Sequence, residues 1–82
     1  MQTFYFHVQY GEHSVDREGT ELPSLQAAQR AAVELLGRML IDEGDAFWSK
    51  PNITVTVEDA RGLVLWSIET LGLASPAVEK FA

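Results

Sequence analysis

Two histidines and two carboxylates near the start of the chain are the residues with the clearest capacity for chemistry. His7 and His13 are its only histidines, and Asp16 and Glu18 follow them closely. Imidazole nitrogens and carboxylate oxygens are common ligands of divalent metals. No recognisable ligand spacing joins these four residues, and both histidines are equally well explained as solvent-facing strand residues. We therefore expect no metal ligands.

The sequence does not indicate an enzyme. General acid–base catalysis needs two carboxylates in one cleft with different pKa values, whereas the carboxylates here fall mostly in expected turns. The serines lack a neighbouring nucleophile motif, the chain has no cysteine, and its glycines form neither a phosphate-binding loop nor a dinucleotide fingerprint. We expect no catalytic residues, no cofactor-binding residues and no cofactor.

Length and charge narrow the class of protein. The chain has 82 residues, of which 46 % are hydrophobic, enough for one small domain with a single core. It is acidic, with a net charge of −6 and only six Lys and Arg residues, so we expect no nucleic-acid partner. No apolar run approaches the roughly 18 residues of a membrane span, and the first residues lack a secretory signal pattern. The expectation is a cytoplasmic protein with no membrane partner.

One long amphipathic helix is predicted over residues 24–43, and the rest of the chain is expected to be arranged around it. Placing successive residues 100° apart gathers the apolar side chains in one arc, with Leu36 near its centre and Arg30 on the opposite face. Ser24 is a suitable N-cap because its hydroxyl can accept a hydrogen bond from a first-turn amide. A helix of this length is marginal alone in water, so we expect it to pack on a sheet.

Four strands are predicted around this helix. Residues 3–10 and 52–58 alternate apolar and polar side chains, a short second strand is expected near residues 13–15, and a hairpin turn at residues 59–62 leads to a last strand over residues 63–68. The chain order is ββαββ. Because the first and last strands are the most continuously apolar, we place them centrally. This gives an α+β fold with the order 2-1-4-3 and parallel central strands, as in the β-grasp fold. Two hairpins packed on the helix in another order are the alternative.

The segment before the helix carries the most distinctive motif. Residues 16–23 read DREGTELP and are expected to form a rigid acidic turn, in which Gly19 permits a positive φ. This motif, with YFHV at residues 5–8, the alanine-rich helix and the last hairpin, resembles a family of small uncharacterised bacterial proteins. That family is a domain of unknown function frequent in rhizobia and related alphaproteobacteria. The resemblance covers about residues 3–68. It implies one bacterial, cytoplasmic domain and no established activity, ligand or catalytic residue.

A single helix covers only one face of a sheet, so the other face is expected to be open. By alternation it should present Tyr5, His7, Thr54, Thr56, Leu63 and Leu65, or Val64, Trp66 and Ile68 from the last strand if that strand has the opposite parity. Either arrangement predicts an apolar centre, and such a patch commonly marks an interface. A single domain over residues 1–70 leaves residues 71–82 as a tail or short helix. This tail or a second copy of the chain would cover the patch.

The function we expect is that of a non-catalytic protein-interaction module, with a homodimer or another protein as partner. The candidate interaction surface combines the open face with the acidic turn: Tyr5, His7, Leu63, Leu65, Asp16, Glu18 and Glu21. The alternative is a small-ligand or metal-binding regulatory domain that uses His7, His13 and the acidic turn.

Overall fold

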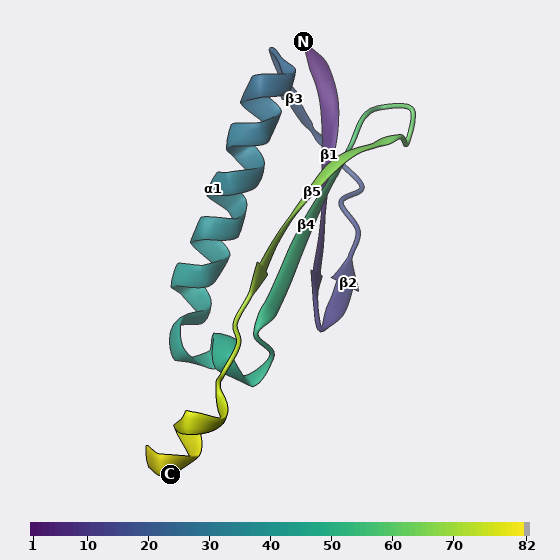
Figure 1. Ribbon diagram of the computed structural model, residues 1–82. Coiled ribbons are helices and arrows are strands. Elements are labelled where there is room, and N and C mark those ends of the chain that lie inside the picture. Colours follow the sequence, from purple (N-terminus) through teal and green to yellow (C-terminus); the bar gives the residue numbers. More distant parts are fainter. Residues whose placement is uncertain (82) are drawn as a thin grey trace.

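A computed structural model describes residues 1–81 and shows one long helix packed along one face of an antiparallel sheet (Figure 1). The elements in chain order are β1 (Gln2–Tyr10), β2 (Glu12–Ser14), β3 (Thr20–Leu22), α1 (Leu25–Glu43), the 3-10 helix η1 (Gly44–Ser49), β4 (Asn52–Glu58), β5 (Val64–Leu71) and the 3-10 helix η2 (Pro76–Phe81). The prediction of an α+β fold with one main helix is confirmed.

The order of the strands differs from the prediction. The sheet runs β2-β1-β4-β5, with β3 also paired to β1, so it has five strands rather than four. Because β4 pairs antiparallel with both β1 and β5, the last strand lies at an edge. The predicted order 2-1-4-3, with parallel central strands as in the β-grasp fold, was therefore wrong.

The error has a physical cause in β4. Its threonines suggested a half-exposed edge strand, but Ile53, Val55 and Val57 are all fully buried under α1. A central strand of an antiparallel sheet with one solvated face also alternates apolar and polar residues. The threonines therefore mark the open face of a central strand and not an edge.

The core lies between α1 and the sheet. On the helix it consists of Ala28, Ala32 and Leu36, and it is completed by Phe4 of β1, by Phe47 of η1 and by the buried side chains of β4. The two alanines let the helix backbone approach the strands. At the start of α1 the amide of Ala27 donates a hydrogen bond of 3.0 Å to the Ser24 hydroxyl, so the predicted N-cap is confirmed.

The sheet face away from α1 is polar rather than apolar. Trp66 and Ile68 pair with Val57 and Val55 and so share their helix-facing side, which leaves Ser67 and Glu69 on the open face. The apolar centre predicted for the open face was therefore wrong.

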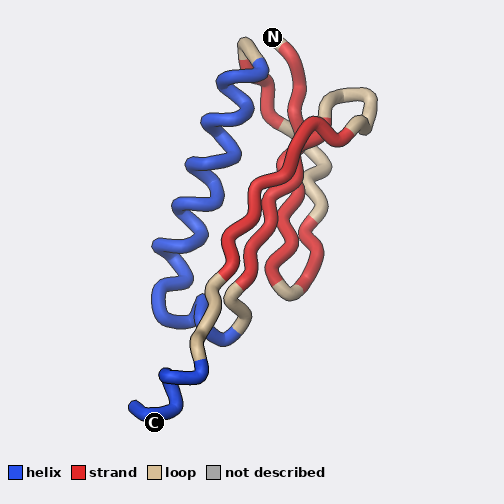
Figure 2. The backbone as a smooth tube through the Cα atoms, in the orientation of Figure 1, coloured by secondary structure: helices blue, strands red, loops and turns tan. Residues whose placement is uncertain are grey.

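Two further residues predicted for the open face lie elsewhere. Leu65 lies at a register shift at the start of β5, where it is half-buried and packs against the core. Leu63 lies in the exposed hairpin before β5. The tail does not cover this face either, because η2 lies beyond the end of the sheet (Figures 1 and 2).

Candidate functional site

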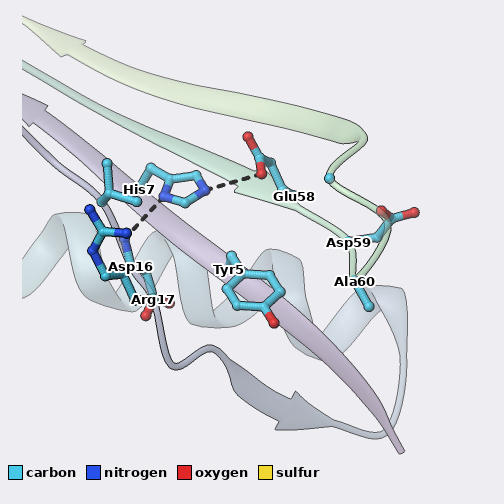
Figure 3. A pocket seen from close by; sticks show the side chains of 9 residues that line it. Tyr5, His7, Asp16, Arg17, Glu58, Asp59 and Ala60 are labelled. Carbon is cyan, nitrogen blue, oxygen red and sulfur yellow. Dashed lines mark hydrogen bonds and ion pairs between the residues drawn. The ribbon is translucent and has the colours of Figure 1, made fainter.

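The first candidate site is a polar cluster on the open face, where β1, β4 and residues 15–19 meet (Figure 3). His7 Nε2 lies 3.2 Å from the Glu58 carboxylate, and the Asp16 amide donates a 3.1 Å hydrogen bond to His7 Nδ1. Because a backbone amide can only donate, Nδ1 must accept, and the proton of the neutral ring sits on Nε2 facing Glu58. Both ring nitrogens are therefore engaged within the protein.

Asp16 closes a break in the sheet. Residues 15–19 lie opposite residues 5–7 of β1, because Val8 pairs with Ser14 and Phe4 pairs with Thr20. Because the loop has two more residues than the facing part of β1, the hydrogen-bond ladder along β1 is interrupted at the point where β2 ends and β3 has not yet begun. Within the gap the Phe6 amide donates to Asp16 Oδ2 at 3.1 Å, which replaces the missing strand partner.

The second carboxylate oxygen of Asp16 holds the loop itself. The amides of Glu18 and Gly19 donate to Oδ1 at 3.2 and 3.0 Å. Partial burial would raise the pKa of Asp16, but the hydrogen bonds from the Gly19, Phe6 and Glu18 amides lower it below its usual value. We call this arrangement of Asp16, His7 and Gly19 the Asp16 bracket.

Gly19 is required by the same bracket. Its φ is +75°, as predicted, and a Cβ there would lie 2.7 Å from Thr3 Cγ2 and 2.9 Å from a Tyr5 ring carbon. Side chains larger than hydrogen would push the loop away from β1. The presence of Asp16 and Gly19 in the segment DREG, residues 16–19, is therefore fully explained by the structure of this loop.

The cluster borders a shallow cavity of about 320 Å³, lined by Tyr5, His7, Val15, Asp16, Arg17, Glu58, Asp59, Ala60 and Gly62 (Figure 3). A general base needs a free ring nitrogen within reach of a substrate, and His7 has none. His13 stacks on His7 with ring centroids 6.4 Å apart, but its Nδ1 lies 2.9 Å from the Gln9 amide oxygen. Among residues 1–81 no group of three or more His, Asp or Glu side chains is arranged to hold a metal. The cluster is arranged as a structural bracket.

The predicted interaction residues are only partly brought together. Three of them share the cluster, namely Tyr5, His7 and Asp16. The other four are spread over the loop, β3, the hairpin and the start of β5: Glu18, Glu21, Leu63 and Leu65.

The second candidate site is the outer edge of β5, which sequence reasoning placed inside the sheet. β5 pairs with β4 on one side, and no strand within the described residues pairs with its other side. Val64 and Leu71 at its two ends are 59 % and 57 % exposed. A groove of about 400 Å³ runs between this edge and α1 and is lined by Gln29, Ala32, Val33, Trp66, Ser67 and Ile68. We call the edge and groove together the β5 seam.

The two edges of the sheet are unequally protected. The far edge consists of β2 and β3, which have three residues each, and the interrupted segment there carries the acidic residues Glu12, Asp16, Glu18 and Glu21. β5 has eight residues, and no charge occurs between Val64 and Ile68. Natural sheets shield their edges with short strands, bulges and charges. β5 has only one irregularity near its start and one charged residue, Glu69, near its end.

Comparison with protein-family models matches residues 3–72 to a family described as a domain of unknown function (DUF6894). The predicted resemblance to a family of unknown function is thereby confirmed, while a bacterial origin stays a prediction. Comparisons with curated proteins and with solved structures gave no match. Within residues 1–81 no helix is both long enough and apolar enough to cross a membrane.

Proposed function

The chain belongs to the DUF6894 family of domains of unknown function, and we propose that it is a non-catalytic protein-interaction module acting through the β5 seam. The observation that carries this proposal is the eight-residue edge of β5, which is free on one side within residues 1–81. The open sheet face supports the proposal less, because its polar side chains already bond to one another.

The pairing across the open face shows this. Thr56 Oγ1 lies 3.1 Å from Ser67 Oγ, and the Asn52 amide donates to Glu69 at 2.8 Å. Together with the contact between His7 and Glu58, these bonds engage the polar side chains that β4 and β5 present on this face. Binding there would first have to break them.

The β5 seam has the features of a site for strand addition. An extended segment that pairs with a free edge gains main-chain hydrogen bonds, and pockets beside the edge select its side chains. The groove supplies apolar walls from Trp66, Ile68 and Val33, and Val33 is 57 % exposed although it lies beside the core. A partner strand would cover this apolar surface and satisfy the free backbone groups in one step.

Site-specific photocrosslinking tests the proposal. A photoreactive amino acid is placed at Val33 or Val64 in the β5 seam, with Gln9 on the exposed part of the open face as the matched control. We expect discrete protein adducts from the two seam positions in cells that naturally produce the protein, and none from Gln9. Adducts from Gln9 alone, or no adduct at any position, would contradict the proposal.

A further inference from the structure

We propose that the partner at the β5 seam is a second copy of this chain. The two β5 strands pair antiparallel about a two-fold axis that is perpendicular to the sheet and passes beside Ser67. The result is one continuous sheet with both α1 helices on the same face. This inference rests on the proposed function and deepens it by naming the partner.

The strand sequence favours a register centred on Ser67. Directly opposite residues of antiparallel strands have their side chains on the same face, which restricts the possible registers. Centring on Ser67 places Trp66 opposite Ile68 of the second copy on the helix-facing side. Pairs of an aromatic and a β-branched residue are favourable across strands, whereas like charges opposite each other are not. Centring on Glu69 would bring the two carboxylates together.

Charge also favours this edge. Each copy carries a net charge of −6, so association is least opposed where charge is absent. The edge from Val64 to Ile68 is uncharged, and so are the groove residues of α1. The acidic residues of the DREG loop lie on the far edge of the sheet, beyond β1. Two copies that meet at β5 therefore keep their acidic edges apart.

Exposed apolar residues at the ends of β5 fit the same arrangement. Antiparallel pairing brings Leu71 of one copy toward the start of β5 and the preceding hairpin of the second copy, where Leu63 lies, and these residues are 57 % and 54 % exposed. Leu73, which is 80 % exposed, follows β5 into the segment that extends past the body (Figure 1). In the pair, this segment would run along the second copy instead of projecting into water.

The helix leaves room on this side. Gly37 follows the groove residue Val33 by one turn of α1, and a Cβ at Gly37 would meet no atom within 4 Å. Glycine weakens a helix relative to alanine, and no contact within residues 1–81 accounts for it here. A perpendicular two-fold axis puts the second α1 on the same face of the sheet, where Gly37 adds no side chain.

Sedimentation and oxidative crosslinking test the pairing on the full chain. We expect a species of twice the 9.1 kDa monomer mass that dissociates on dilution. The chain has no cysteine, so Ser67→Cys introduces a single thiol. Opposite residues in antiparallel strands have Cα atoms about 4.5–5.5 Å apart, within the range of about 4.4–6.8 Å that a disulfide bridges. We expect rapid disulfide dimers from Ser67→Cys and none from Ser14→Cys, an exposed serine on the far edge.

A charge variant provides the second measurement. Ser67 is exposed, so Ser67→Lys should fold, but it places two ammonium groups opposite each other at the axis. We expect this variant to weaken dimerisation by at least about fivefold, while Ser14→Lys leaves it unchanged.

The outcomes separate this inference from the proposed function. A chain that remains monomeric up to about 1 mM, where even weak association is detected, overturns the second copy as partner. If the seam positions still gave adducts with another protein, the interaction module would stand without self-association. A dimer in which Ser67→Cys fails to crosslink, or in which Ser67→Lys has no effect, overturns the pairing at β5.

Discussion

Replacing Asp16 by alanine should destabilise the fold as strongly as a change in the core, although the residue lies at the surface. The substitution leaves the amides of Phe6 and Gly19 without their acceptor, and both residues are half-buried. A buried donor left unpaired costs about 1–3 kcal/mol, and water can partly replace the carboxylate here. The Glu18 amide is exposed and adds little. We expect Asp16→Ala to lower the free energy of unfolding by about 2–4 kcal/mol.

Urea denaturation at neutral pH measures this loss, with Glu18→Ala as the matched control. Glu18 is an exposed carboxylate in the same loop, so its replacement should change the free energy of unfolding by less than about 0.5 kcal/mol. Equal destabilisation by the two variants would show that loss of charge in the loop, and not the Asp16 bracket, sets the effect.

The same variant predicts a pH dependence. The folded-state pKa of Asp16 lies below its unfolded value, so its stabilisation is fully present above an unfolded pKa of about 3.9. It is lost as the pH falls through the lowered folded pKa. The difference in stability between the natural chain and Asp16→Ala should therefore shrink in acid. A constant difference down to that range would mean that the carboxylate charge contributes nothing.

Two further predictions concern α1. Leu36→Ala should lower the free energy of unfolding by about 2–5 kcal/mol because Leu36 is buried against the sheet. Arg30→Ala, on the exposed face, should lower it by less than about 0.5 kcal/mol in the same urea assay. Similar losses from the two variants would mean that the helix is oriented differently. Gly37→Ala should raise the melting temperature, because alanine favours a helix by about 0.5–1 kcal/mol relative to glycine and its Cβ would meet no other atom of the chain. A lower melting temperature for the dissociated monomer would show that the added Cβ is not accommodated.

Features that depend on neighbouring residues were predictable from the sequence. The helix expected over residues 24–43 is α1 (Leu25–Glu43) with Ser24 as its cap, because periodicity and capping are local signals. The hairpin before β5 and the positive φ of Gly19 follow from turn chemistry for the same reason. The short strand expected near residues 13–15 appears as β2 (Glu12–Ser14).

Features that depend on long-range pairing were not predictable. β5 lies at the edge because β1 pairs with β4 and not with β5. The apolar run at residues 63–68 fits a central strand as well as an edge strand, so it does not predict this choice of partner. β3 was missed because its three residues sit among turn residues and form a strand only by pairing with Gln2–Phe4. The reach of Asp16 to Phe6 and His7 likewise requires the two-residue excess in the loop, which shows only once β2 and β3 are both paired.

The two edges of the sheet differ in how well they are protected, and this difference determines which assemblies can form by strand addition. A chain with two open edges would add copies at both and grow into a filament, whereas a chain with one open edge closes as a two-fold pair. The Asp16 bracket keeps the far edge closed by holding a broken, acidic strand against β1. We therefore expect Asp16→Ala, at concentrations where the natural chain forms only dimers, to give larger assemblies in sedimentation experiments. Glu18→Ala, which leaves the bracket intact, should remain dimeric. Larger assemblies from Glu18→Ala as well would show that charge alone protects this edge, while dimers from both variants would mean that the bracket does not protect it.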